Sequence, residues 1–570
     1  MNALFARLRP RAYWLDWLII LLVVYLFSRA ALLDFDPQQL QQTGEHNESA
    51  TLPILAEIGL LRYGEIPLWN PYMLTGFPHA GDLINHFWNP VATLPVLLWG
   101  GVNGMKVSIF LSLLIAAFGQ WFLAHVFGLR GPFRLWAGLL FALSGGLALL
   151  SWLGWYELLV GVAWFPWCFA ALWAALRRPR SALRRRDRRS LVLTALAVTM
   201  VITAGGGYYP LYLAVSLAVL TGAALLWSPP AERGLRLRRA VAVALLAAGL
   251  SAVYLAPLAD GLRYTGRDAP PDFLQIGSQP IPYALFNYVV SDPTWFRVDT
   301  LNKGTGIGWF YIGLLPLAAL ALLPWVYSRF PGRRRGILTL GALLLVLLLW
   351  HANRHFPVRA LYDLLPFLHT FRFPNRLLII AAVPLIVLAA IGLQGLLVRA
   401  RRRWRSRTPN LDAPLLLNLA MIVLLAAALA DVARVNRPFA VAPHARNENA
   451  RAALTWLRQQ DTSLYYVNIG GTIIYWDWLA YAYELEMPVL NFRYNRRVLS
   501  MDAQYASASP FNAQPKYTFA AQDQTGPPGA TQIAAFNEVN VWRRDDVLPF
   551  AFTVAPGQPI APGSVPAVAV

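Results

Sequence analysis

The residues best suited to chemistry lie in one polar stretch, residues 34–90, which follows the first apolar segment of the chain. Acidic residues are scarce elsewhere, with 29 Asp plus Glu against 49 Lys plus Arg in the whole sequence. The stretch nevertheless holds seven carboxylates and three histidines: Asp34, Asp36, Glu45, Glu48, Glu57, Glu65 and Asp82, with His46, His79 and His86. A carboxylate can take a proton from an attacking hydroxyl, and paired carboxylates can hold a divalent cation. Both chemistries remain open from the residues alone.

Three carboxylates in this stretch are candidates for a general base. Residues 52–61 have apolar side chains at helical spacing, which predicts a helix lying along the membrane surface. Such a helix would hold Glu45 and Glu48 at the boundary between membrane and water. The third candidate is Asp36, which forms a pair with Asp34 just after the first apolar segment.

A second group of candidates lies in the connection at residues 351–376, which is rich in basic side chains. They are His351, Arg354, His355, Arg359, His369, Arg372 and Arg376. A guanidinium forms bidentate, charge-assisted hydrogen bonds with phosphate. Arg372 and Arg376 stand one helical turn apart and, with His355, would suit a phosphate group. The alternative is that these side chains reach lipid headgroups or pair with acids in the loops.

Composition places these groups in a membrane protein. The 570 residues are 57% hydrophobic and 14% charged, with a mean hydropathy of +0.44, which is typical of polytopic membrane proteins. The lone cysteine, Cys168, excludes a disulfide framework or a cysteine-based zinc site. The net charge of +20 falls in short arginine-rich connections, which indicates membrane topology and not a nucleic-acid partner.

Eleven apolar windows are long enough to cross a hydrocarbon layer of about 30 Å. They begin near Trp14, Met105, Leu135, Leu158, Leu191, Leu211, Ala240, Gly308, Ile337, Leu377 and Leu415. Basic clusters occupy alternate connections, which the positive-inside rule assigns to the cytoplasm together with the N-terminus. Loops 34–103, 259–306 and 351–376 then face outward. We therefore expect a mainly α, polytopic membrane protein of about eleven transmembrane helices.

An odd number of spans also places the C-terminal segment outside. We predict a transmembrane domain over residues 1–433 and a small extracytoplasmic α/β domain over residues 434–570. Strands are predicted near residues 463–469 and 539–542, where β-branched and aromatic residues are bounded by Gly and Pro. Asp16 and Asp431 lie in or near apolar windows, where an acid is a functional candidate by default.

Three separated motifs carry a resemblance to a known family. Residues Gly64–Tyr72 read GEIPLWNPY and are followed by Gly76–Pro78 and Ala80–Asp82. This pattern resembles the fingerprint of bacterial YfhO-type membrane proteins, in which a G-x-[IL]-P-L-W-N-P-Y run follows the first span. Phe371–Arg376 and Val541–Phe552 extend the resemblance in the same order. YfhO-type proteins are similar to the GT-C superfamily of polyprenyl-phosphate-sugar-dependent glycosyltransferases.

The resemblance implies a GT-C-like fold and an inverting membrane glycosyltransferase. The donor would be a polyprenyl-phosphate-linked sugar, and the acceptor an extracytoplasmic glycan, lipid or protein of the envelope. In the family a Gly-Asp pair commonly lies about one helix upstream of the fingerprint. Gly44-Glu45 occupies that place here, with Glu replacing Asp, so Glu45 becomes the first candidate for the base, ahead of Glu48 and Asp36. The bacterial inner membrane is the expected location.

Further roles follow from the same resemblance. Arg372 and Arg376 would receive the donor phosphate, and Trp69, Asn70 and Asp82 would shape the loop. No cofactor is certain, although a divalent cation is possible. The rival interpretation is a non-enzymatic transporter or an envelope-assembly protein for lipid-linked glycans. A transporter would need a continuous polar path, and the apolar windows contain few charges.

Overall fold

The protein forms two compact units. The computed structural model describes residues 2–40, 46–73, 76–177, 185–261, 265–266, 277–292, 309–355, 359–360, 364, 374–405, 413–440, 444–469, 475–489, 497–498 and 515–546. The membrane unit comprises Met1–Asp34, Lys106–Ala252 and Ala269–Ala442. The loop-tail unit comprises Phe35–Met105, Val253–Asp268 and Pro443–Val570. The first polar loop and the C-terminal segment therefore share one unit.

Seven helical stretches of the described chain are long and apolar enough to cross a membrane. They are Pro90–Val126, Pro132–Leu153, Tyr156–Leu176, Tyr209–Leu226, Pro331–His351, Pro374–Trp404 and Leu415–Phe439. Helices α10 (Pro230–Leu250) and α11 (Ala252–Gly261) meet at an angle of 73° and would supply an eighth span if they are counted together. The expectation of a mainly α, polytopic membrane protein is confirmed.

Three other expected spans are helical but are not among these eight. Helix α1 covers Asn2–Leu32, and α8 covers Arg185–Ile202, beginning with an arginine-rich turn. Helices α15 (Leu314–Leu320) and α16 (Leu323–Arg329) have seven residues each, about 10 Å, so neither alone crosses a 30 Å layer. The count of eleven stays a prediction.

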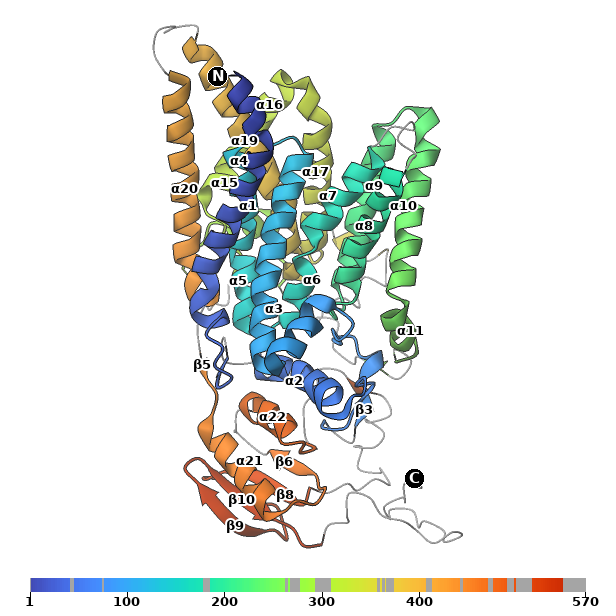
Figure 1. The fold of residues 1–570 in the computed structure, drawn as a ribbon, viewed down its shortest axis with the longest axis vertical. Coiled ribbons are helices and arrows are strands. Elements are labelled where there is room, and N and C mark those ends of the chain that lie inside the picture. The colour runs from blue at the N-terminus through green and yellow to red at the C-terminus, as the bar shows by residue number, and fades with distance from the viewer. Residues whose placement is uncertain are drawn as a thin grey trace. The chain divides into compact units, whose positions relative to one another are not determined.

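The core of the membrane unit is built around α19 (Leu377–Arg405). Its apolar window is 94% buried, whereas that of α20 (Ala413–Ala440) is only 17% buried, and α20 lies along one edge of the bundle (Figure 1). Helix α19 packs against several of the remaining helices. These are α4 (Pro132–Ala142), α5 (Gly145–Leu153), α7 (Phe165–Leu176) and α17 (Pro331–His351), together with α15, α16 and α20. The other helices of the bundle are α3 (Pro90–Val126), α6 (Tyr156–Val162), α9 (Tyr209–Leu226) and α13 (Ile281–Phe286). The exposed leucines of α20 suit a lipid-facing helix.

The C-terminal part of the loop-tail unit contains a four-stranded sheet in the order β6-β8-β10-β9. Strands β6 (Val467–Ile469) and β8 (Tyr517–Ala521) are parallel, and β10 (Val539–Arg543) pairs antiparallel with both β8 and β9 (Thr531–Phe536). Helices α21 (Glu448–Gln460) and α22 (Tyr475–Glu484) accompany the sheet (Figure 1). The strands predicted in the tail are β6 and β10, and the small α/β region is confirmed.

The short elements of the same unit come from the first loop and its partners. They are α2 (His46–Glu57), the π-helix η1 (Ile58–Tyr63), the 3₁₀ turn η2 (His79–Gly81), β1 (Gln39–Leu40) with β5 (His444–Ala445), β2 (Trp69–Asn70) with β3 (Phe77–Pro78), and β4 (Thr265–Gly266) with β7 (Arg497–Val498). Helix α20 extends across residues 433 and 434. The assignment of residues 434–570 to a separate extracytoplasmic domain stays a prediction.

Helix α2 corrects one expectation. A helix does cover most of residues 52–61, but it is not a surface helix. Leu52, Ile54 and Leu55 are all buried, and α2 packs against α22. The pattern of apolar residues required a nonpolar partner, and packing against α22 buries these residues in place of the membrane surface.

Candidate functional site

The polar loop is shaped by three successive side-chain turns that lead the chain into α3. Asp82 Oδ1 accepts a hydrogen bond from the Ile84 amide at 3.3 Å. Asn85 accepts one from the Phe87 amide at 2.8 Å, and Asn89 one from the Val91 amide at 3.0 Å. Asp and Asn side chains form such turns by bonding to the backbone two residues ahead. The carboxylate of Asp82 is buried and takes part in holding the loop.

Two histidines in this loop are buried and uncharged at neutral pH. Burial lowers the pKa of His79 to about 4, although the nearby Asp82 carboxylate opposes the shift. Burial also lowers the pKa of His86 to about 4, and its Nδ1 lies 3.2 Å from the Ile84 carbonyl oxygen. Neither ring therefore offers a positive charge to a phosphate at neutral pH.

The fingerprint run fastens the first loop to the C-terminal tail. Asn70 Nδ2 donates to the Tyr483 hydroxyl of α22 at 2.7 Å, and Asn70 Oδ1 accepts from the Tyr72 amide at 3.1 Å. The Val489 amide then donates to the Tyr72 carbonyl oxygen at 2.9 Å. Val489 also forms parallel bridges with Met73 on one side and with Val467 of β6 on the other. The loop thus extends the edge of the tail sheet.

Trp69 stands beside this junction with its side chain about half exposed. Its indole lies against Gly76, where a Cβ atom would come within 2.5 Å of Trp69 Nε1. Gly76 has a φ of +89°, so the position requires glycine for both space and backbone conformation. Trp69 is consequently held by the strand pair β2 and β3 while part of its side chain remains exposed.

Another loop carboxylate caps a break in α3. Gly100 has a φ of +77° and interrupts the helix, so a new helical segment begins after it. Glu57 Oε2 accepts a hydrogen bond from the Gly101 amide at 2.5 Å. An anionic side chain at a helix N-terminus satisfies a free amide and interacts favourably with the helix dipole. The role of Glu57 seen here is structural.

The end of the first apolar helix carries a paired acid and a strained turn. In the membrane unit, Lys106 Nζ lies 2.5 Å from Asp34 Oδ1, and the lysine side chain is buried. In the loop-tail unit, Phe35 has a φ of +53°, an uncommon conformation for a residue with a side chain. Asn103 Nδ2 donates to the Phe35 carbonyl oxygen at 3.0 Å, and Asp36 Oδ1 accepts from the Gln38 amide at 2.9 Å.

Arg376 forms the centre of a second site, in the membrane unit. Its guanidinium lies 4.4 Å from the centre of the Trp155 ring and 5.3 Å from that of Tyr208. Trp155 directly precedes α6 and Tyr208 directly precedes α9. The arginine side chain is largely buried, and cation–π contacts offset part of the cost of removing a charge from water.

The segment around Ser278 joins the rest of the basic connection to this site. Ser278 Oγ donates to the His351 carbonyl oxygen at 2.9 Å, and His351 Nδ1 lies 3.1 Å from the Pro374 carbonyl oxygen. His355 Nε2 lies 3.3 Å from the Ser278 carbonyl oxygen. These contacts link the segment that carries His355 with the segment that carries Arg376, and the two segments are together called the basic cluster. Ser278 belongs to loop 259–306 and His351 to loop 351–376, and both loops were expected to face outward.

Only some of the remaining predicted site residues lie in the part of the chain that the structure describes. Asp36, Trp69, Asn70 and Asp82 lie in the loop-tail unit. Glu45 and Arg372 lie outside the described residues, as does the Glu48 side chain. Among the residues that the structure describes, no group of three or more His, Cys, Asp or Glu side chains could hold a metal ion.

The two acids in apolar windows have partners within the membrane unit. Asp16 Oδ2 accepts from Arg134 Nε and from Trp121 Nε1, both at 2.9 Å. Asp431 accepts from the Tyr311 hydroxyl and lies 3.2 Å from Arg434. These contacts account for both acids as structural groups.

Sequence reasoning did not assign roles to Lys106, Trp155 or Tyr208. A lone lysine near the start of an apolar window is an unusual placement, and that placement was the available signal for Lys106. Trp155 was interpreted as an aromatic residue at the membrane interface. That interpretation does not predict its contact with the Arg376 guanidinium.

Comparison with known proteins finds solved structures of similar fold. No protein-family model and no curated protein matches the sequence. Among solved structures, arabinofuranosyltransferase AftD from Mycobacteria has a TM-score of 0.55 and 16% identity over 92% of this chain. ArnT from Cupriavidus metallidurans, bound to undecaprenyl phosphate, has a TM-score of 0.52 and 15% identity, covering 93% of this chain and 97% of ArnT.

A third structure shows the same fold. The archaeal oligosaccharyltransferase AglB from Archaeoglobus fulgidus, in complex with an inhibitory peptide and a dolichol-phosphate, has a TM-score of 0.52 and 13% identity, over 90% of this chain and 70% of AglB. This chain spans only 39% of the length of AftD. The fold described here is therefore similar to the folds of these three proteins. The assignment to the YfhO-type family stays a prediction.

Proposed function

We propose that the protein is a membrane glycosyltransferase that moves a sugar from a polyprenyl-phosphate donor to an extracytoplasmic acceptor, with inversion at the anomeric carbon. The observation that carries this proposal is the buried Arg376 between Trp155 and Tyr208, in a fold shared with proteins whose structures contain lipid phosphates. The acceptor would be an envelope glycan, lipid or protein. The protein would reside in the bacterial inner membrane with its N-terminus in the cytoplasm.

Arg376 has the properties that a phosphate ligand requires. Its guanidinium is always charged, and the Trp155 and Tyr208 rings beside it would restrict the orientation of the fork. A fork held in one orientation can bind two phosphate oxygens at once. Arg372 and His355 would contribute further hydrogen bonds to the same group. The fixed positive charge would stabilise the negative charge that develops when the lipid phosphate leaves.

The chemical step needs a carboxylate near the acceptor. The carboxylate takes the proton of an acceptor hydroxyl, and the hydroxyl oxygen forms a bond with the anomeric carbon as the bond from that carbon to the phosphate oxygen breaks. The polyprenyl phosphate departs with the electron pair. Glu45 is the first candidate for this base, and Glu48 and Asp36 are the others. Asp36 gains support from the strained Phe35 beside it, because strain of about 1–3 kcal/mol tends to be retained at functional positions.

The tail would help to bind the acceptor. The fingerprint run is joined to α22 and to the tail sheet, so Trp69 is presented from a braced strand pair. A half-exposed indole offers an apolar face that can stack on a sugar ring. Trp69, Asn70 and Asp82 would therefore shape the acceptor side of the site without taking part in proton transfer.

Transfer from labelled polyprenyl-phosphate sugars in proteoliposomes tests the assignment of the base. Glu45→Gln, Glu48→Gln and Asp36→Asn each remove one charge with little change in volume. We expect one of them to lower the rate of transfer by at least about 100-fold. Glu65→Gln is the matched control, because Glu65 is an exposed acid of the same loop. Full transfer by all three variants would contradict the assignment. If the folded native protein transfers no sugar but moves lipid-linked glycans across the bilayer, the transporter interpretation replaces the enzyme.

A further inference from the structure

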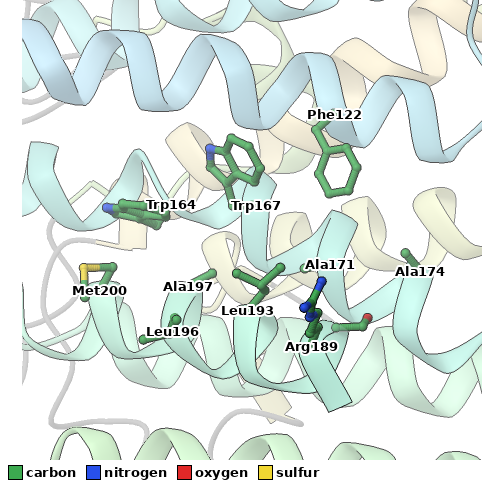
Figure 2. A pocket seen from close by; sticks show the side chains of 11 residues that line it. Phe122, Trp164, Trp167, Ala171, Ala174, Arg189, Leu193, Leu196, Ala197 and Met200 are labelled. Atoms are coloured by element: carbon green, nitrogen blue, oxygen red, sulfur yellow. The ribbon is translucent and has the colours of Figure 1, made fainter. Parts of the chain in front are cut away.

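A hollow in the membrane unit lies between α3, α7 and α8, and Arg376 is not among the residues that line it. Its volume is about 630 Å³, within the range of pockets that hold small molecules. The lining is mostly apolar and partly aromatic, and Arg189 lies at one end of it (Figure 2). Ser190 is the other polar residue of the lining. The position of Arg189 differs from that of the basic cluster. Arg189 is near the start of α8, whereas Tyr208, which contacts Arg376, follows the other end of that helix.

One wall of this hollow is aromatic and fixed. Trp167 Nε1 donates to the Ile115 carbonyl oxygen at 2.8 Å. The same indole lies against Gly119 of α3, where a Cβ atom would approach its ring to 2.5 Å. The ring centres of Phe122 and Trp164 lie 5.4 and 6.4 Å from that of Trp167, which makes a row of three rings (Figure 2). A wall fixed by a hydrogen bond and close packing loses little entropy when a chain binds against it.

The opposite wall comes from one face of α8. Arg189, Leu193, Ala197 and Met200 all line the hollow and recur at intervals of three or four residues. Eleven steps of 1.5 Å separate Arg189 from Met200, which gives about 16 Å along the helix. This length is about half of a 30 Å hydrocarbon layer. The hollow therefore has the length of one lipid leaflet, with its charge at one end.

Charge and shape together select the ligand. Arg189 is exposed and makes no ion pair or side-chain hydrogen bond with any described residue. We propose that the hollow binds an anionic glycerophospholipid, with one acyl chain along the aromatic wall and the phosphate at Arg189. An arginine at the headgroup end attracts an anionic headgroup, and the apolar walls exclude polar ligands from the remainder. The proposal concerns a bound membrane lipid, and it does not depend on the glycosyltransferase function.

Native mass spectrometry of the purified full-length protein tests this proposal. The protein is titrated with phosphatidylglycerol or phosphatidylcholine that carries identical acyl chains. We expect the native protein to retain phosphatidylglycerol preferentially, and Arg189→Gln to lower that retention about fivefold. Arg188→Gln is the matched control, because Arg188 is also exposed but does not line the hollow. Ala197→Phe, which fills the hollow, should abolish retention of both lipids.

Three outcomes would overturn the proposal. Equal losses in the Arg188→Gln and Arg189→Gln variants would show that surface charge alone attracts the lipid. Retention of lipid by Ala197→Phe would place the lipid elsewhere. Displacement of phosphatidylglycerol by an equal concentration of undecaprenyl phosphate would assign the hollow to a polyprenyl lipid. Because both arginines are exposed, their pair of variants remains decisive if Ala197→Phe fails to fold.

Discussion

Replacement of Asn70 by alanine tests how the fingerprint run joins the first loop to the tail. The change removes a hydrogen bond of 2.7 Å to the Tyr483 hydroxyl and one of 3.1 Å from the Tyr72 amide. Asn70 is fully buried, so water cannot easily replace either bond. At about 0.5–1.5 kcal/mol for each hydrogen bond, we expect the junction to lose about 1–3 kcal/mol.

Hydrogen exchange at the Val489 amide measures this loss directly. That amide donates to the Tyr72 carbonyl oxygen at 2.9 Å and is released when the junction opens. A loss of about 1–3 kcal/mol predicts an increase in exchange rate of about 5- to 150-fold. Tyr483→Phe removes only one of the two bonds, so its effect should be smaller. Unchanged exchange at Val489 in a folded Asn70→Ala variant would refute the reasoning.

The other predictions concern the structural charges. Replacement of either Asp16 or Arg134 alone should destabilise the membrane unit by about 3–5 kcal/mol, because the partner charge is left buried and unpaired. The double variant Asp16→Leu with Arg134→Leu should lose less stability than either single variant. Thermal unfolding in detergent measures both effects. The pKa of His79 is lowered by burial, so the unfolded chain binds more protons between about pH 4 and 6.5. Stability should therefore be full above pH 6.5 and fall as the pH decreases towards 4; a His79→Gln variant with the same pH slope as the native protein would contradict this. Glu57→Ala should lower thermal stability by about 1 kcal/mol through loss of the Gly101 cap, and an unchanged Tm would exclude that role.

The sequence predicted the long apolar helices and two of the four tail strands, β6 and β10, because their signals are local. Apolar windows of sufficient length and the β-branched run at Val467 need no knowledge of distant residues. The partner of α2 could not be predicted in this way. Helical spacing showed that α2 has apolar side chains, but a membrane surface and α22 satisfy that pattern equally well. More than 400 residues separate Asn70 from Tyr483, and such a pairing has no local signal.

The candidate site likewise contains one residue that the sequence predicted and contacts that it did not. Arg376 was predicted from its charge and from its spacing to Arg372, which are features of the sequence. The aromatic walls around it were not predicted, because Trp155 and Tyr208 lie in other connections and resemble ordinary interfacial residues. Glu57 was grouped with the other acids of the loop, since its contact with Gly101 depends on a break in a helix that composition does not reveal.

Sugar transfer by purified protein in lipid nanodiscs tests the central claim most directly. The native protein should release polyprenyl phosphate from a labelled polyprenyl-phosphate sugar in proportion to the glycosylated acceptor formed. Arg376→Gln should lower that rate by about 100-fold or more, because it removes the positive charge opposite the leaving phosphate. Arg359→Gln, at an exposed arginine of the same connection, should retain native transfer. Equal rates for the native protein and Arg376→Gln would contradict the proposed phosphate site.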